Sequence, residues 1–267
     1  MKKLFALLLT AATCLSLAAC DSNEPVIEGR SGESDLAYVR EKGSLVVGIT
    51  EFEPMDYQDG DGNWIGFDAD MAAAFAESLG VEVQFRLIEW GDKVDLLNDK
   101  TIDTVWNGMT LNDEVKAAME TSKPYFNNAQ VVIVKADAAD RYQTVEELGG
   151  AVFALEPNSA AEEQAIAYGL NYTEVQNQEA ALQSVSDGDS DAAVVDFLMA
   201  IAMIGEGTGY PDLTYTVSLS SEEYGVGFRK GSDLAAALDV FFTDSYEDGT
   251  MQSAARNYGI SAFLLAQ

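Results

Sequence analysis

Three carboxylates, Glu51, Glu156 and Asp196, are candidates for chemistry in this chain. A carboxylate pairs with a cationic group when ionised, and it acts as a general acid or base when burial raises its pKa. The sequence has no histidine, which excludes serine–histidine catalysis and histidine metal ligation. Binding of a polar ligand and carboxylate catalysis both stay open, and neither a metal site nor a cofactor is predicted.

The composition is strongly acidic. There are 45 Asp and Glu residues against 15 Lys and Arg, which gives a formal charge of −30. Such a surface repels nucleic acid and anionic membrane, so we expect neither as an electrostatic partner. The simplest interpretation of the charge is a well-solvated surface that resists sticking.

Residues 1–20 have the layout of a secretory signal, with two lysines, an apolar stretch and then small residues. The apolar stretch is shorter than the roughly 20 residues needed to span a bilayer. It ends in LAAC at 17–20, which resembles the bacterial lipobox. This resemblance implies a lipoprotein whose Cys20 carries acyl chains such as palmitate, held on the extracytoplasmic face of the cell membrane. The alternative is an ordinary signal peptide with a chance cysteine.

The rest of the chain predicts an α/β protein. Residues 21–35 are polar and without periodicity, which predicts a flexible tether. Short apolar runs then alternate with helical patterns, which favours mostly parallel sheets. Asp68 is predicted to cap the first helix and Gly80 to end it. The predicted strands lie at 45–49, 81–87, 101–105, 131–134, 151–155, 192–195 and 224–228. The predicted helices lie at 68–79, 93–98, 112–119, 144–148, 159–168, 177–187, 197–204 and, as the terminal helix, 234–248.

Nine segments, in order, carry a family resemblance. They are GSLVVGI at 43–49, PMDY at 54–57, GFDADM at 66–71, LGVEV at 79–83, IDTVWNGMT at 102–110, SKPY at 122–125, DAAVVD at 191–196, EYGVGFRKG at 223–231 and DGT at 248–250. In order and spacing they resemble the extracellular solute-binding proteins of polar amino acid ABC importers (solute-binding family 3). The resemblance covers about residues 36–259.

The resemblance implies a two-lobed fold of the periplasmic-binding-protein type (type II) with a two-strand hinge. The first lobe would be 36–132 plus 229–267, and the second lobe, with the hinge strands, 133–228. It implies a monomeric binding protein, not an enzyme, that closes its lobes on a small polar solute. The solute, expected to be an amino acid, would pass to the ABC permease subunits in the membrane. Alternatives are an exported dehydratase of a cyclic acid on the same fold, or a ligand-sensing receptor.

The resemblance also assigns candidate ligand-binding residues. Asp196, at the end of a predicted strand, would contact the ligand ammonium, and the alternative is a cap for the helix from Phe197. Phe52 and Trp90 would form aromatic walls of the cleft. The further candidates are Glu51, Asn107, Gly108, Met109, Thr110, Asn158 and Ser159.

Two of these segments have local alternatives or departures. Residues 107–110 are predicted to form a loop whose N–H groups and Thr110 hydroxyl face the ligand, or else a capping box from Thr110 to Asp113. Asn158 and Ser159 open a predicted helix, where Pro157 stands in place of the family glycine.

The largest departure from the family is at Val115, where an arginine commonly clamps the ligand carboxylate. Removing one member of a buried ion pair costs roughly 3–5 kcal/mol. Another cation (Arg86, Lys93 or Lys116) could substitute, helix N-termini could suffice, or the ligand could lack a free carboxylate. The acidic candidates Glu51 and Asp196 favour a neutral polar or cationic amino acid over an acidic one.

Overall fold

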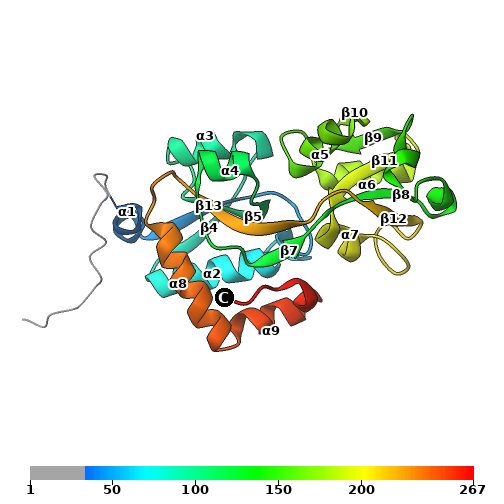
Figure 1. The fold of residues 1–267 in the computed structure, drawn as a ribbon. Coiled ribbons are helices and arrows are strands. Elements are labelled where there is room, and N and C mark those ends of the chain that lie inside the picture. Colours follow the sequence, from blue (N-terminus) through cyan, green and yellow to red (C-terminus); the bar gives the residue numbers. More distant parts are fainter. Residues whose placement is uncertain (1–33) are drawn as a thin grey trace, which may run out of the picture. The chain divides into compact units, whose positions relative to one another are not determined.

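The computed structural model describes residues 34–267. The predicted signal, the lipobox with Cys20 and the tether up to residue 33 lie outside the described residues. Within residues 34–267 no helix is both long and apolar enough to cross a bilayer. Two main sheets, each flanked by helices, divide this part of the chain into two lobes (Figure 1).

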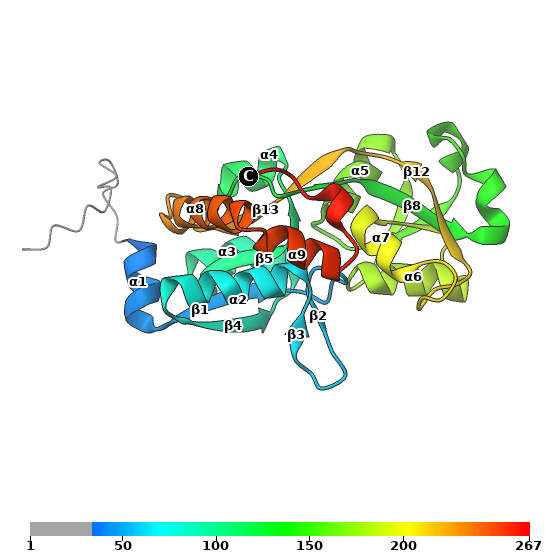
Figure 2. The same cartoon turned by 90° about the horizontal axis from the view of Figure 1, so that it is seen from below.

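The sheet of the first lobe has the order β4-β1-β5-β13-β6, with β7 also paired to β13. Its strands are β1 (Ser44–Ile49), β4 (Glu82–Leu87), β5 (Thr104–Thr110), β6 (Glu120–Thr121), β7 (Phe126–Asn128) and β13 (Glu222–Phe228). β1 runs parallel to both of its neighbours, whereas β13 is antiparallel to β5, β6 and β7. A small hairpin of β2 (Tyr57–Gln58) and β3 (Trp64–Ile65) projects from this lobe (Figure 2).

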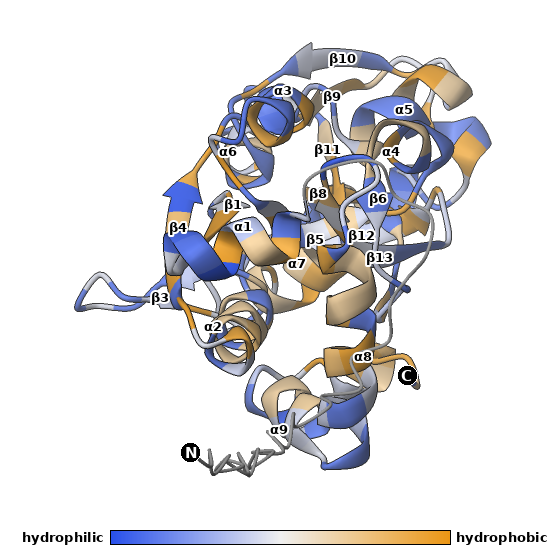
Figure 3. Ribbon diagram, turned by 90° about the vertical axis from the view of Figure 1, so that its left-hand side faces the viewer, coloured by the Kyte–Doolittle hydropathy of each residue, from blue (hydrophilic) through white to orange (hydrophobic). Residues whose placement is uncertain are grey.

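The sheet of the second lobe has the order β10-β9-β11-β8-β12. Its strands are β8 (Gln130–Lys135), β9 (Val152–Leu155), β10 (Asn171–Glu174), β11 (Ala192–Asp196) and β12 (Leu213–Ser218). β9, β10 and β11 are parallel, and β8 is antiparallel to β11 and β12. The central β11 is fully buried, whereas the edge strand β10 is hydrophilic (Figure 3). A polar edge strand protects the sheet from pairing with another chain.

Helices cover both faces of the first sheet (Figure 1). α3 and α4 lie on one side, and α2, α8 and α9 on the other. The helices of the first lobe are α1 (Asp35–Lys42), α2 (Phe67–Leu79), α3 (Lys93–Asn98), α4 (Asp113–Ala118), α8 (Leu234–Glu247) and α9 (Thr250–Asn257). Those of the second lobe are α5 (Ala160–Tyr168), α6 (Gln178–Asp187) and α7 (Phe197–Met203). Short 3-10 turns lie at Trp90–Asp92, Ala136–Arg141, Val145–Leu148 and Ser261–Phe263.

The α/β class and the two lobes agree with the sequence, but the sheets are mixed rather than mostly parallel. The reason is that the chain crosses between the lobes twice, from β7 to β8 and from β12 to β13, and the crossing strands run against their neighbours. Strand pairing also moves the expected boundaries. β8 joins the second sheet from Gln130, and β13 joins the first sheet from Glu222, ahead of the predicted break at 228.

Three local predictions also change. Gly66, not Asp68, is the N-cap of α2, and Asp68 is fully buried inside the first turn. The predicted terminal helix is followed by α9, because Gly249 adopts φ 87° and interrupts the helical path. Asp35, assigned to the tether, begins α1 and is buried. Gly80 does end α2 in the left-handed conformation, as predicted.

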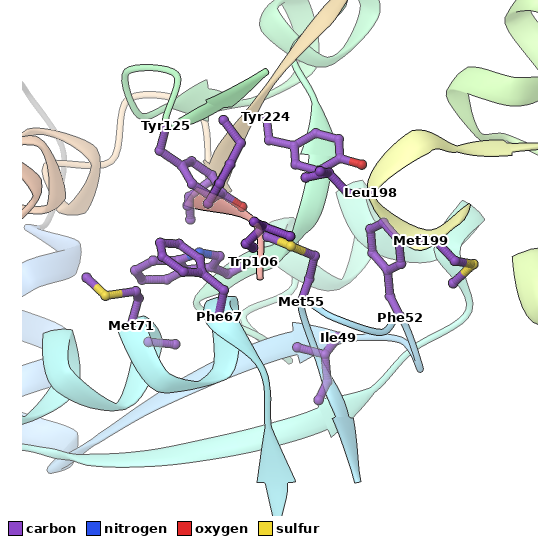
Figure 4. Close-up of a cluster of buried hydrophobic side chains, with 14 of the residues drawn as sticks. Ile49, Phe52, Met55, Phe67, Met71, Trp106, Tyr125, Leu198, Met199 and Tyr224 are labelled. Carbon is purple, nitrogen blue, oxygen red and sulfur yellow. The ribbon is translucent and has the colours of Figure 1, made fainter. Parts of the chain in front are cut away.

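One apolar core runs across the junction of the lobes. Phe67, Trp106 and Tyr125 pack in the first lobe, with Phe67 and Tyr125 stacked at 6.0 Å between ring centroids. Leu198 and Met199 of α7 approach Phe52 and Tyr224 from the second lobe (Figure 4). Phe52 meets Tyr224 edge to face, with ring centroids 6.3 Å apart.

A buried network of ion pairs and hydrogen bonds holds the start of the C-terminal segment, after β13, to the rest of the first lobe. Arg229, directly after β13, donates from Nε to both oxygens of Asp35 at 3.1 Å. Its Nη1 donates to the carbonyls of Leu97 and Ile102 at 3.2 and 2.9 Å. Asp103, fully buried beside Arg229, also accepts from Lys42 Nζ at 2.6 Å. These bonds join α1, α3, β5 and the C-terminal segment.

Arg229→Ala is expected to lower the free energy of unfolding by about 3–5 kcal/mol, because it leaves Asp35 buried without its cation and removes one of the two cations beside Asp103. Urea denaturation of the chain without residues 1–20 measures this change. Arg256→Ala, on the exposed face of α9, is the matched control and should change stability by less than about 0.5 kcal/mol. Equal effects of the two substitutions would contradict the structural role of Arg229.

Candidate functional site: a cleft between the lobes

A cavity of about 310 Å³ lies between the two lobes. Its walls come from loops and strand ends of both sheets, where ligands of α/β proteins commonly bind. Nine of the ten candidate residues line it: Phe52, Trp90, Asn107, Gly108, Met109, Thr110, Asn158, Ser159 and Asp196. Glu51 is not among the lining residues, although its neighbours Thr50 and Phe52 are.

Asp196 ends β11 and is only 6% exposed. Its Oδ1 accepts hydrogen bonds from Tyr224 Oη at 2.7 Å, from Gln130 Nε2 at 2.9 Å and from Asn128 Nδ2. Its Oδ2 accepts from Gln178 Nε2. Asp196 occupies the N-cap position of α7, yet its side chain makes no capping bond. The carboxylate is therefore held at the cavity wall by side chains and does not serve the helix.

Glu222, at the start of β13, faces the same amides. Its Oε1 accepts from Asn128 Nδ2 at 2.7 Å, from Gln130 Nε2 at 2.8 Å and from Thr110 Oγ1 at 2.8 Å. Two amide groups at the crossing thus bridge two carboxylates. Burial, followed by repulsion from Glu222, raises the pKa of Asp196 to about 7.

Asn107 to Thr110 are the last residues of β5 and not a loop. Met109 and Thr110 pair with β13, which extends the strand through the segment predicted to be a loop. The predicted capping box is also wrong. Asn112 caps α4 by accepting from the Val115 N–H at 2.8 Å, and the Thr110 hydroxyl bonds to Glu222.

Gly108 makes the close packing of this wall possible. Its φ is 54°, which disfavours other residues, and a Cβ there would lie 2.3 Å from Cε1 of Phe52. Phe52 can therefore lie directly against the backbone of β5. The glycine explains how an aromatic ring and the strand can form one continuous cavity wall.

Two fully buried carboxylates support this wall from behind. Asp56 accepts from Asn107 Nδ2 at 2.8 Å, and Asp68 accepts from the Gly108 N–H at 2.6 Å. The Tyr125 hydroxyl also bonds to Asp68 at 2.8 Å. Burial raises the pKa of Asp68 to about 7 and that of Asp56 well above its ordinary value. These bonds fix the orientation of Asn107, whose Oδ1 accepts from the Thr50 hydroxyl and N–H.

Among residues 34–267, Lys93 is the only side chain with a positive charge that lines the cavity. It is 8% exposed, lies 4.5 Å from the centroid of the Trp90 ring, and donates to the carbonyls of Trp90 at 3.0 Å and of Asn158 at 3.3 Å. Trp90 belongs to the first lobe and Asn158 to the second, so Lys93 spans the cleft. A second bond across the cleft joins Asn112 Nδ2 to Glu163 Oε2 at 2.8 Å.

Glu156, directly after β9, also lines the cavity and is 7% exposed. Within the described residues its carboxylate forms neither a hydrogen bond nor an ion pair. Burial, followed by repulsion from Asp196, raises its pKa to about 8, although the charge of Lys93 opposes the shift. Burial lowers the pKa of Lys93 to about 8. The wall opposite β5 therefore carries a carboxylate without a partner among residues 34–267.

Several site residues have no clear sequence signal. Gln178 orients Asp196, and its Oε1 also accepts from the Asp196 N–H at 2.8 Å. Asn128 and Gln130 lie on the crossing strands β7 and β8, outside the motifs that carry the family resemblance, and Tyr224 lies within one of those motifs without a predicted contact to the site. Among residues 34–267 no cluster of three potential metal-binding side chains is present.

The family model for bacterial extracellular solute-binding proteins, family 3, matches residues 45–261. This chain belongs to that family. The L-cystine-binding protein TcyJ of Escherichia coli is 28% identical over 87% of this chain and 88% of its own. A solved structure of an arginine-bound variant of ArgBP from T. maritima is 31% identical, covers 77% of this chain and 97% of its own, and has a TM-score of 0.72.

A further relative, the cyclohexadienyl dehydratase of Pseudomonas aeruginosa, is 31% identical but matches 55% of this chain and 53% of its own. The two relatives named before it are binding proteins and match this family 3 chain over most of its length. The two-lobed fold of the chain is that of the amino acid-binding structures. The family and fold agree with the resemblance seen in the sequence, and the chain is grouped with binding proteins rather than enzymes.

The free energy of unfolding of the ligand-free protein should fall as the pH rises from about 5 to about 8. Because folding raises the pKa of Glu156 from 4.5 to about 8, the folded state binds this proton more tightly than the unfolded chain. The contribution is complete below about pH 4.5 and is lost as the pH passes about 8. Glu156→Gln should remove it, and the difference between the two proteins over this range is on the order of 3 kcal/mol.

Urea denaturation at several pH values measures this difference. Glu174→Gln, at an exposed position of β10, is the control and should follow the native protein. Parallel stability curves for the native protein and Glu156→Gln would show that Glu156 titrates at its ordinary pKa.

Proposed function

We propose that this chain is the substrate-binding lipoprotein of an ABC importer. It captures a small polar solute, an amino acid, between its lobes and delivers it to the permease subunits. Cys20 carries the lipid that anchors it on the extracytoplasmic face of the membrane. The observation that carries the proposal is Asp196, a buried carboxylate at the wall of an interlobe cavity. Family membership and the ligands named for its relatives support it.

The charge and shape of the cavity support a ligand-binding role. Asp196 would receive the ligand ammonium, since Oδ2 accepts one bond, from Gln178, and an ionised carboxylate oxygen can accept more. The β5 wall from Asn107 to Thr110, with Phe52 against it, would form one side of the cleft. Asn158 and Ser159 would close the other side from the second lobe. Contacts across the cleft, such as Asn112 to Glu163, would hold the lobes together around the ligand.

A thermal-shift screen of the soluble chain without residues 1–20, against free amino acids, small peptides and amines, tests the proposal. A ligand at 100 times its dissociation constant stabilises the fold by about 2.7 kcal/mol, so at least one amino acid should raise the melting temperature clearly. Mass spectrometry should recover that ligand unchanged. A chemically altered ligand would favour the dehydratase alternative. If no amino acid raised the melting temperature, the result would contradict the proposal.

Asp196→Asn should weaken binding of that amino acid by more than about a hundredfold, which corresponds to roughly 3 kcal/mol. The reason is that the ligand ammonium loses its buried counter-charge. Isothermal titration calorimetry measures the change, with Asp189→Asn in the exposed turn before β11 as the matched control. Unchanged affinity in Asp196→Asn would remove Asp196 from the site.

A further inference from the structure

We propose that the ligand is an amino acid with a cationic side chain, held by three buried charges of the cleft. Asp196 takes the α-ammonium, Lys93 takes the α-carboxylate, and Glu156 takes the cation of the side chain. The inference rests on the proposed function, since it assumes an amino acid ligand, and it adds the class of amino acid and the roles of Lys93 and Glu156.

The first step is the charge balance of the cavity. Of the charged side chains that line it, Asp196, Glu156 and Lys93 are buried, at 6%, 7% and 8% exposure. The remaining lining carboxylates, on Glu114, Glu162 and Glu163, are more exposed. When all three groups are ionised, two buried anions against one buried cation leave a net charge of −1, and the raised pKa values of Asp196 and Glu156 reflect the cost of that excess negative charge. A neutral amino acid would preserve this imbalance, an acidic one would increase it, and a cationic one would cancel it.

The second step is the carboxylate of Glu156, which has no partner among residues 34–267. A buried charge without a hydrogen bond or counter-ion is costly, and proteins rarely keep one unless a ligand or metal completes it. By contrast, Asp196 already accepts four side-chain hydrogen bonds. The unpartnered carboxylate lines the cavity, so a ligand cation that enters the cavity can reach it.

The third step concerns the ligand carboxylate. Val115, where the family commonly has an arginine, is an apolar lining residue here. Of the three substitute cations suggested by the sequence, Lys93 lines the cavity, whereas Arg86 and Lys116 do not. Its ammonium has three N–H groups and gives two of them to the Trp90 and Asn158 carbonyls, which leaves one for an anion.

The shape of the cavity fits the same ligand. Phe52 and Trp90 supply aromatic faces for the aliphatic part of a long side chain. Lys93, in α3, and Glu156, directly after β9, come from opposite lobes, so a ligand that bonds to both would bridge the cleft and stabilise the closed lobes. The same two residues would therefore set both the ligand class and the strength of closure.

Calorimetry with two matched ligand pairs tests the inference. L-citrulline is L-arginine with an uncharged side-chain end, and agmatine is arginine without the α-carboxylate. The native soluble chain should bind L-arginine at least tenfold more tightly than either. In Glu156→Gln the preference for arginine over citrulline should fall to about one. In Lys93→Met the preference for arginine over agmatine should fall to about one.

Glu174→Gln, exposed on β10 of the same lobe as Glu156, should keep both preferences. Citrulline bound as tightly as arginine by the native chain would overturn the inference while leaving the proposed function intact, because an amino acid still binds. Failure of every amino acid in the thermal-shift screen would instead refute the proposed function itself. The comparison within the native chain decides the matter even if a variant does not fold.

Discussion

The cost of burying carboxylates at the junction of two lobes is the constraint on which the rest of this structure depends. Asp196 can stay at the cavity wall because donors from both lobes converge on it, with Gln178 from α6, Gln130 from β8 and Tyr224 from β13. These donors come together only because the chain crosses between the sheets twice. The mixed pairing of the sheets and the two crossings therefore bring together the donors that hold Asp196. The apolar core lies across the same junction of the lobes.

The remaining charges follow from the same principle. Behind the β5 wall, Asp56 accepts a hydrogen bond from the Asn107 side chain and Asp68 accepts one from the Gly108 N–H. These bonds restrict the movement of Asn107 and Gly108. Glu156 is different, because no donor in residues 34–267 meets it, and Lys93 stands across the cleft from it. A wall braced by hydrogen bonds to Asp56 and Asp68 thus faces a second wall that carries the unpartnered carboxylate of Glu156. In the proposed complex a cationic ligand would supply the missing counter-charge for Glu156 and would link lobe closure to ligand charge.

The sequence predicts much of this from local signals. Alternating short strands and helices indicate the α/β class, whereas the two lobes are implied by the family resemblance of the ordered motifs. Local signals fail where distant contacts decide. Residues 107–110 are expected from the sequence to form a loop, but pairing with β13 continues the strand through them. The position of Asp68 in the sequence suggests a helix cap, but its carboxylate instead accepts hydrogen bonds from the Gly108 N–H and the Tyr125 hydroxyl. Gln130 and Gln178 carry no signal because their role exists only once β8, α6 and β11 are assembled. The sequence likewise cannot predict that Glu156 lacks a partner, because this depends on which side chains the folded lobes place near its carboxylate.

The crystal structure of the soluble chain with its tightest-binding amino acid tests the central claim most directly. The account predicts closed lobes, with the α-ammonium in hydrogen-bond contact with Asp196 Oδ2 and the ligand enclosed between the β5 wall and the start of α5. A bound amino acid whose ammonium lies away from Asp196, or a ligand bound outside the interlobe cavity, would contradict it.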